Sequence, residues 1–313
     1  MQFEILFFSE IDEYAIESYS AIHNVSKEKN LGDITKIDVE SLPKDFTILT
    51  HGSPCTDFSK AGRQKGGDKG SGTASSLMWN SVEIIRHCKP KFVLWENVDN
   101  VLSYRHKHNF DAYIEELSEI GYNSYYKLMN ARNYGWPQNR NRVFVLSIRK
   151  DIDKGFEFPE EIPLLIDFRD LLDLCVSSSY FCDDIAYKFD KFSTYRKRIQ
   201  EKDYCDTLCA LDSSLDCKNI KVIRVGDKLR KLTPSEYWRV MGFADEDIVS
   251  AELVGVPEQE LYKQAGNSIC VKVLKLIYKN IINQYGNGFI ENTTVGSLFS
   301  GVGAFEMALR DMY

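Results

Sequence analysis

The sequence ends with VGSLFSGVGAFEMALRDMY, residues 295–313, and this stretch decides the fold class. Its first part is apolar and predicts a buried strand, Gly301-Val-Gly303 predicts a turn, and the residues that follow have the apolar spacing of a helix. A glycine turn between a strand and a helix lets the backbone approach a bound nucleotide closely. Many nucleotide-binding sheets begin with this arrangement, whereas here it stands at the C-terminus.

The residues expected after such a turn lie at the other end of the chain. A dinucleotide-binding turn has a third glycine three residues on, but Glu306 occupies that position, which disfavours NAD or FAD. A nucleotide-binding sheet also needs an acidic residue about 20 positions later to hold the ribose hydroxyls. If the two ends of the chain are joined, Glu10 falls twenty positions after Gly303, at the end of the next predicted strand. The sequence therefore predicts a circularly permuted nucleotide-binding domain.

Between these two ends, predicted strands and helices alternate. The predicted strands cover residues 3–10, 45–55, 91–98, 123–131 and 142–149, and the predicted helices cover 12–23, 77–88, 109–120, 233–243 and 271–285. This alternation is typical of an α/β fold with a mostly parallel sheet, whose ligands gather at the carboxyl ends of its strands. From about Pro159 the pattern loosens, which predicts a smaller inserted domain. We assign residues 1–160 and 255–313 to the large domain and 161–254 to the small one, with a polar linker at 286–294.

The composition is that of an ordinary globular protein. Hydrophobic residues make up 43%, no apolar run is long enough to cross a membrane, and the N-terminus lacks the basic segment of a signal peptide. Eight cysteines without a CxxC pair favour a reducing compartment. Cys205, Cys209 and Cys217 lack the spacing of a metal site. We therefore expect a cytoplasmic protein that binds no metal.

The charge is distributed unevenly along the chain. The formal net charge is −7, which on average argues against a polyanionic partner. From Ala186 to Lys231, however, twelve Lys and Arg stand against seven Asp and Glu, a local charge of +5. Such a stretch is either a solvated basic face or a surface that contacts phosphates, and charge alone does not decide between the two.

Three segments that follow or begin predicted strands carry reactive side chains. Cys55 lies in a Pro-Cys turn before the polar Ser59–Ser76 loop, which favours an accessible nucleophile over a buried structural cysteine. Glu96 ends an apolar run, where burial would raise its pKa so that it can donate a proton; the alternatives are a helix cap or a surface acid. Arg140 and Arg142 are two residues apart, so they either share one face of a strand or are surface arginines.

Taken in order, these residues resemble the C5-cytosine DNA methyltransferase family. The matching segments are EID (10–12), GDI (32–34), GSPCTDFS (52–59), ENV (96–98), QNRNR (138–142), RKLTPSEYWRVMGF (230–243), YKQAGNSI (262–269) and LFSGVGAFE (298–306). They span nearly the whole chain except its middle, and their joint occurrence is very specific. The family's first block stands last here, so the chain resembles a circularly permuted member. Ser53 and Thr56 also depart from the family, in which many members carry Phe before the proline and Gln after the cysteine.

The resemblance implies a Rossmann-like methyltransferase that transfers a methyl group from S-adenosylmethionine to carbon 5 of a cytosine flipped out of double-stranded DNA. It implies that Cys55 attacks carbon 6, Glu96 supplies a proton near ring nitrogen 3, and Arg142 contacts the cytosine. Arg140 would order the site. The implied cofactor residues are Glu10, Ile11, Asp33, Ile34, Pro54, Asn267, Ser268, Phe299, Ser300, Gly301 and Gly303.

The inserted segment takes the place of the family's target-recognition domain, which assigns its basic charge to DNA phosphates. The DNA contacts expected are Ser59, Lys60, Arg63, Lys65, Arg196, Arg198, Lys221, Arg224 and Lys228. An RNA methyltransferase of the same fold and a catalytically dead DNA-binding relative are the alternatives. We expect a bacterial or phage-encoded monomer that associates with the nucleoid through DNA, with a cognate restriction endonuclease as a candidate partner. The sequence leaves open whether one chain completes its own sheet or two chains exchange their C-terminal strands.

Overall fold

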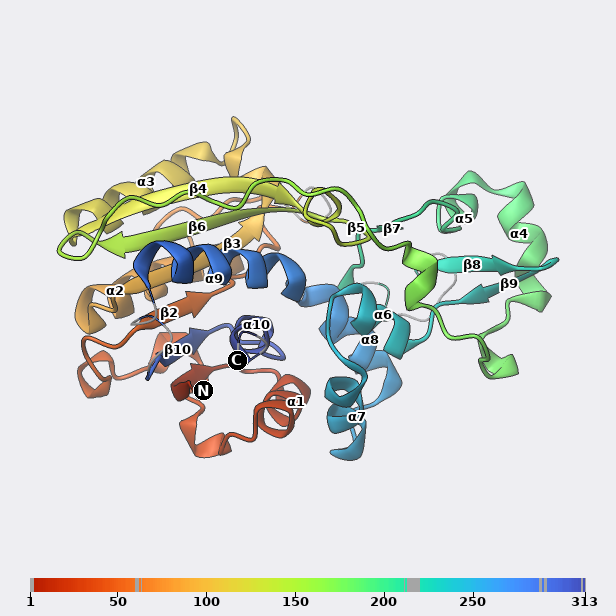
Figure 1. The fold of residues 1–313 in the computed structure, drawn as a ribbon, viewed down its shortest axis with the longest axis horizontal. Coiled ribbons are helices and arrows are strands. Elements are labelled where there is room, and N and C mark those ends of the chain that lie inside the picture. The colour runs from red at the N-terminus through yellow and green to blue at the C-terminus, as the bar shows by residue number, and fades with distance from the viewer. Residues whose placement is uncertain are drawn as a thin grey trace.

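The computed structural model describes residues 3–59, 62, 64–210, 212, 220–286, 289, 292–310 and 312. Its larger part is a six-stranded sheet with the order β1-β10-β2-β3-β6-β4 (Figure 1). The strands are β1 (Glu4–Ser9), β2 (Ile48–His51), β3 (Phe92–Val98), β4 (Tyr122–Asn130), β6 (Asn141–Arg149) and β10 (Thr294–Leu298). In this sheet β6 runs in the direction opposite to the other five strands. The predicted α/β fold with a mostly parallel sheet is confirmed.

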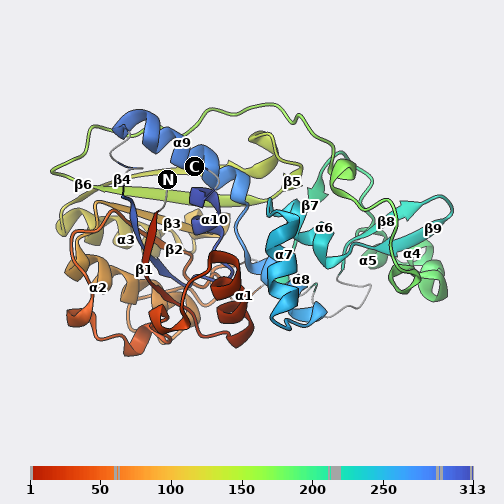
Figure 2. The same cartoon turned by 60° about the horizontal axis from the view of Figure 1, so that its bottom comes forward.

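The C-terminal strand β10 lies inside the sheet, between β1 and β2. Val295 pairs with Ile5 on one side and with Ile48 on the other, both in parallel register. The Thr294 hydroxyl also accepts a hydrogen bond from the backbone N–H of Thr47 at 3.0 Å. The chain therefore completes this sheet with its own last strand. Its two ends lie close together in both views (Figures 1 and 2).

Helices cover both faces of the sheet, and alternating side chains along each strand build one core on each face. These helices are α1 (Glu13–His23), α2 (Met78–Cys88), α3 (Lys107–Glu119), α9 (Val271–Tyr285) and α10 (Ala304–Arg310). Phe92 and Leu94 of β3 share a core with residues of α9 and α10. Val93 and Trp95 share the other core with residues of α2 and α3, on the opposite side of the sheet (Figure 2). Because both faces are covered, β3 is buried along its whole length.

Several predicted boundaries move because of local backbone conformation. The strand predicted for 45–55 is confined to β2, since Asp45 adopts a left-handed φ of 58° and the Gly-Ser-Pro turn begins directly after His51. Thr294, predicted to belong to the linker, is the first residue of β10, and residues 287, 288, 290 and 291 of that linker lie outside the described residues. Helix α9 is the longest in the described chain at 15 residues, and none of the described helices is long and apolar enough to cross a membrane.

A smaller lobe extends from the ends of the central strands (Figure 1). Its elements, together with those that join it to the sheet, are β5 (Gln138–Asn139), α4 (Ala186–Lys191), α5 (Ser193–Arg196), β7 (Cys205–Asp206), β8 (Val222–Val225), β9 (Lys228–Lys231), α6 (Pro234–Val240), α7 (Asp245–Leu253) and α8 (Glu258–Asn267). Strand β5 follows β4 and pairs with β7, which ties the lobe to the larger part. Phe189 and Tyr195 of the lobe belong to the same buried cluster as Leu274 of α9, so the apolar core is continuous.

Candidate active site

A cavity of about 430 Å³ opens where β1, β10, β2 and β3 end. Its walls include all four predicted catalytic residues and every predicted cofactor residue except Gly303. Those residues are Cys55, Glu96, Arg140, Arg142, Glu10, Ile11, Asp33, Ile34, Pro54, Asn267, Ser268, Phe299, Ser300 and Gly301. Parallel strands present their carboxyl ends at one edge of a sheet, which explains how segments so far apart in the chain meet here.

The glycine turn after β10 is joined to the end of β1 through the Glu10 carboxylate. One carboxylate oxygen, Oε2, accepts a hydrogen bond from the Gly301 N–H at 2.8 Å. The other, Oε1, accepts from the N–H groups of Ile11 and Asp12 at 2.8 and 3.0 Å. Phe299 and Gly301 both adopt a φ of 54°, which bends the backbone around this carboxylate. The N-terminal and C-terminal segments therefore build one wall of the cavity together.

Gly303 packs against α1 and is not among the residues that line the cavity. Its φ is 79°, and a Cβ added there would lie 2.1 Å from Nε2 of His23. His23, on α1, also places Nε2 3.1 Å from the Val302 carbonyl oxygen. Burial lowers the pKa of His23 to about 4, so the ring is neutral at neutral pH. Only glycine leaves room for this ring against the turn.

Cys55 is half-buried in the turn that follows β2. Its carbonyl oxygen accepts hydrogen bonds from the N–H groups of Phe58 and Ser59 at 3.0 and 2.7 Å, and the Ser75 hydroxyl donates to the Pro54 carbonyl at 2.8 Å. Burial raises the pKa of the thiol, while the nearby Arg142 charge opposes that shift. The thiol is thus held in a fixed turn, and its ionisation responds to the charged groups around it.

Glu96, on β3, lines the same cavity as Cys55 and is 8% exposed. Strand β6 runs antiparallel to β3 and brings Arg142 beside it, with Nε of Arg142 2.8 Å from Oε1 of Glu96. Burial raises the pKa of Glu96, and the charges of Arg142 and Arg140 oppose the rise. A carboxyl group in this environment can hold and release a proton closer to neutral pH than an exposed glutamate can.

Arg140 is buried and organises the backbone around the site. Its guanidinium donates hydrogen bonds to the carbonyl oxygens of Leu208 at 2.9 Å, Gly266 at 3.1 Å and Ser268 at 2.6 Å. Burial lowers its pKa to about 10, which still leaves the group charged at neutral pH. One side chain therefore joins the smaller lobe, the end of α8 and the cavity.

Lys263, which the sequence analysis missed, also lines the cavity. Its Nζ donates to Oδ2 of Asp12 at 2.7 Å and to Oε2 of Glu260 at 2.8 Å, which links α8 to the start of α1. These bonds to Asp12 and Glu260 raise the pKa of Lys263. The available signal was its place within YKQAGNSI, three residues before Gly266.

The predicted DNA contacts occupy different environments. Lys65, Arg196, Arg224 and Lys228 are exposed, Ser59 and Arg198 are half-buried, and Lys60 and Arg63 lie outside the described residues. The assignment of Lys221 is wrong, because its side chain is buried with Nζ 3.9 Å from Oδ2 of Asp212. A count of local charge cannot reveal that a lysine points inward. Lys228 is exposed but lies 2.8 Å from Asp183, so its charge is partly balanced.

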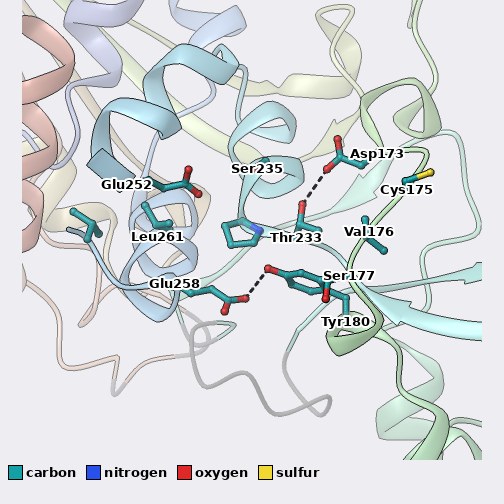
Figure 3. A pocket seen from close by; sticks show the side chains of 12 residues that line it. Asp173, Cys175, Val176, Ser177, Tyr180, Thr233, Ser235, Glu252, Glu258 and Leu261 are labelled. Carbon is teal, nitrogen blue, oxygen red and sulfur yellow. Dashed lines mark hydrogen bonds between the residues drawn. The ribbon is translucent and has the colours of Figure 1, made fainter. Parts of the chain in front are cut away.

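A second cavity, of about 440 Å³, lies between residues 173–180 and the starts of α6 and α8 (Figure 3). The Tyr180 hydroxyl donates to Glu258 at 3.0 Å across it, and the Thr233 hydroxyl lies 3.4 Å from Asp173. None of the predicted catalytic or cofactor residues lines this cavity, so the first cavity is the candidate active site. Within the described residues no three His, Cys, Asp or Glu side chains form a group that could hold a metal, and Cys217 lies outside them.

Several known proteins are related to this chain in sequence. The family model for C-5 cytosine-specific DNA methylase matches residues 1–283, a match that stops before β10. The Type II methyltransferase M2.ScrFI of Lactococcus lactis subsp. cremoris is 38% identical over 265 residues, covering 81% of this chain and 71% of that protein. The Type II methyltransferase M.Bsp6I of Bacillus sp. (strain RFL6) is 33% identical over 301 residues, covering 89% of this chain and 91% of that protein.

Solved structures show the same fold at lower sequence identity. The S. pombe Dnmt2 methyltransferase has a TM-score of 0.67 at 20% identity, covering 90% of this chain and 91% of that one. A putative DNA modification methyltransferase encoded within an E. coli prophage has a TM-score of 0.64 at 16% identity, covering 89% and 92%. The family match over most of the sequence, together with the relative that is 38% identical, establishes that the chain belongs to the C-5 cytosine-specific DNA methylase family and is a DNA cytosine-5 methyltransferase.

Proposed function

We propose that Cys55 is the nucleophile and Glu96 the proton donor of this methyltransferase, acting on a cytosine flipped into the cavity from double-stranded DNA. The observation that carries the proposal is the meeting of Cys55, Glu96 and the Arg140–Arg142 segment in the cavity that also contains the glycine turn. S-adenosylmethionine, when bound, supplies the methyl group from its sulfonium. A cytosine ring is a poor nucleophile at carbon 5, and covalent attack at carbon 6 overcomes this.

In this proposal Glu96 accounts for the proton movement at ring nitrogen 3. The Cys55 thiolate bonds to carbon 6, and the carbon 5–carbon 6 double bond shifts to carbons 4 and 5. The electrons of the carbon 4–nitrogen 3 double bond pass to nitrogen 3, which takes a proton from Glu96, and carbon 5 becomes the nucleophilic end of an enamine. After carbon 5 has accepted the methyl group, it loses its proton to a base. Elimination then breaks the sulfur–carbon bond, restores the aromatic ring and the thiolate, and returns the nitrogen 3 proton to Glu96. The raised pKa of Glu96 suits this exchange near neutral pH.

The donor and acceptor groups of the cavity fit S-adenosylmethionine. Glu10 would hold the ribose hydroxyls, Asp33 the adenine amine, and Ile34 would pack against the adenine ring. Phe299, Ser300, Gly301, Asn267 and Ser268 would surround the methionine end, with Pro54 and the exposed Ile11 at the edges. Ser268 Oγ is buried and has no hydrogen-bond partner among the described residues, which supports a ligand contact at this point.

The smaller lobe supplies the surface for DNA in this proposal. Arg196 and Arg224 are exposed on it, and Lys65 is exposed on the loop after Cys55. Such side chains position a duplex through its phosphates, while base edges specify the sequence. The buried Lys221 is removed from this set. The names of the relatives, Type II methyltransferases, support a role in DNA modification beside a restriction endonuclease.

The position of β10 supports the circular permutation. In this proposal the C-terminal strand and turn replace the family's first block, and residues 286–294 lead to them from α9. Two observations favour it: the family match ends at residue 283, and β10 nevertheless occupies an interior position of the sheet. Joining the two ends of the sequence predicts that the glycine turn lies beside Glu10, the acidic residue expected to hold the ribose. The hydrogen bond between Gly301 and Glu10 agrees with this prediction.

The proposal is tested by covalent trapping. DNA in which 5-fluorocytosine replaces cytosine should form a stable covalent complex with the protein in the presence of S-adenosylmethionine, because fluorine cannot leave carbon 5 as a proton does. Cys55→Ala should abolish the complex and leave cofactor affinity nearly unchanged, whereas Cys175→Ala, at an exposed cysteine, should trap normally. Mass spectrometry of the complex identifies the attached residue. Trapping that persists in Cys55→Ala, or that occurs only with RNA, would contradict the proposal.

A further inference from the structure

Ser53, directly before the Pro54-Cys55 turn, is bonded on two sides by the neighbouring strand. Its side chain is 3% exposed. The hydroxyl oxygen accepts hydrogen bonds from the Trp95 indole N–H at 3.0 Å and from the Asn97 amide at 3.3 Å. The same Asn97 amide nitrogen donates to the Ser53 carbonyl oxygen at 3.0 Å.

The two donors flank Glu96 on β3. Because side chains alternate along a strand, Trp95 and Asn97 point to one face while Glu96 points to the other. A Cβ added at Gly52 would lie 3.9 Å from Oε2 of Glu96, so the backbone before Ser53 is close to the carboxylate itself. The residues directly before and after Glu96 on β3 therefore both bond Ser53, which stands two positions before Cys55.

Trp95 is itself rigidly held. It is 1% exposed, and its ring centroid lies 4.4 Å from that of Tyr113 and 5.9 Å from that of His51. These two neighbours also contact each other, with Nε2 of His51 2.9 Å from the hydroxyl oxygen of Tyr113. Burial lowers the pKa of His51 to about 3, so no charge disturbs this group at neutral pH. The indole N–H is thus held in place against the Ser53 hydroxyl.

We infer that Trp95 and Ser53 are a positioning pair, in which the indole acts through the serine hydroxyl to set the place of Cys55 relative to Glu96. The inference rests on the proposed roles of Cys55 and Glu96. Adduct formation requires the sulfur to approach carbon 6 while Glu96 faces the same ring, and a displacement of about 1 Å can cost roughly 100-fold in rate. Losing the pair should therefore slow adduct formation more than it weakens cofactor binding.

The test compares Ser53→Ala, Trp95→Phe and the double variant with a matched control, Ser147→Ala. Ser147 is a buried serine of β6 whose hydroxyl lies 2.8 Å from that of Ser124, away from the cavity. The trapping rate on 5-fluorocytosine DNA is measured at saturating S-adenosylmethionine, and cofactor affinity by calorimetry. We expect each pair variant to slow trapping by roughly 10- to 100-fold, the double variant to be no slower than Ser53→Ala, and Ser147→Ala to trap within about twofold of the unmodified protein.

Each outcome bears on the pair separately from the proposed function. Unchanged trapping in folded Ser53→Ala and Trp95→Phe would overturn the pair while leaving Cys55 as the nucleophile. Additive losses in the double variant, or an equal loss in Ser147→Ala, would show general destabilisation instead of positioning. Thermal unfolding establishes that the variants are folded at the assay temperature, and two independent pair variants allow the test if one of them does not fold. Covalent trapping by the Cys55→Ala variant would contradict the proposed function itself.

Discussion

At the scale of single residues, the chemistry of the site depends on charges brought from distant segments. The Cys55 thiol is disfavoured as a thiolate by burial, and Arg142 is the first of the groups that oppose this. The same guanidinium lies against Glu96 at 2.8 Å. Arg142 therefore favours the ionised forms of both Cys55 and Glu96, so its removal should raise the pKa of both groups.

Replacing Arg142 by methionine should raise the pKa of Cys55, since a cation that stabilises the thiolate is lost. The thiolate is the reactive form, so alkylation of Cys55 by iodoacetamide should become slower near neutral pH. The rise of the alkylation rate with pH should move to higher pH. The measurement is the rate of peptide alkylation against pH by mass spectrometry, with exposed Cys175 as an internal reference whose profile stays the same. A Cys55 profile that keeps its position, or moves to lower pH, would contradict the role of Arg142.

The sequence predicted which residues line the cavity better than it predicted the partners of those residues. Cys55, Glu96 and the arginines stand at strand ends or beside them, and a parallel sheet gathers such positions at one edge. The three carbonyl partners of Arg140 could not be predicted, because residues 208, 266 and 268 approach it only through the packing of the lobe. Lys221 was misassigned for the same reason, since its partner Asp212 is defined by folding and not by charge count.

At the scale of elements, the turn between β10 and α10 is where local conformation and packing meet. Gly301 and Gly303 both have positive φ, yet their surroundings differ: a Cβ at Gly301 has no neighbour within 4 Å, while one at Gly303 would meet His23 and Tyr19 of α1. The first glycine satisfies a backbone requirement alone. The second also satisfies a packing requirement.

Gly303→Ala should therefore destabilise the protein by on the order of 2–4 kcal/mol, the sum of a left-handed alanine and a steric clash. Gly301→Ala should cost only about 1 kcal/mol, because strain without a clash remains. Combining Gly303→Ala with His23→Ala should recover part of the loss. Urea unfolding of the four proteins measures these differences. Equal costs for the two glycines would show that α1 does not press on the turn.

Element type could be predicted from periodicity, and element ends could not. The fully buried β3 reads as a continuous apolar run, and the 15 residues of α9 show the spacing of a helix with one buried face. The end of β2 was placed too late because the turn from Gly52 onward is fixed by bonds to Trp95 and Asn97. Such bonds join residues more than 40 positions apart and leave no local signal.

At the scale of the whole molecule, the sheet is held together by the two ends of the chain. Strand β10 has a partner on each edge, and the turn after it carries the Gly301 N–H that Glu10 accepts. Removing β10 would separate β1 from β2 and open the wall of the cavity. The order of the strands in the sheet therefore differs from their order in the sequence.

Deleting residues 293–313 should abolish S-adenosylmethionine binding and lower the thermal stability of the large part. Moving the same segment to the front, joined to Met1 by a short spacer, should restore both, because the two chain ends lie close together. Calorimetry of cofactor binding is the measurement. A control carries Gly296→Val in the moved segment and should not be restored, since even a Cβ there would lie 2.5 Å from the Phe7 ring. Cofactor binding by the truncated chain would refute the permutation.

The interior position of β10 has a consequence for folding during synthesis on the ribosome. Glu4 pairs with Thr294, so β1 must wait for β10 before the two strands can pair. At roughly 5–20 residues per second, the wait is about 15–60 s. During that time β1 and β2 each expose an apolar, unpaired edge, the kind of surface that attracts other chains. The methyltransferase therefore cannot form this wall of the cavity before β10 and the Gly301 turn have been made, and a nascent chain that stalls ahead of them lacks the contact between Gly301 and Glu10.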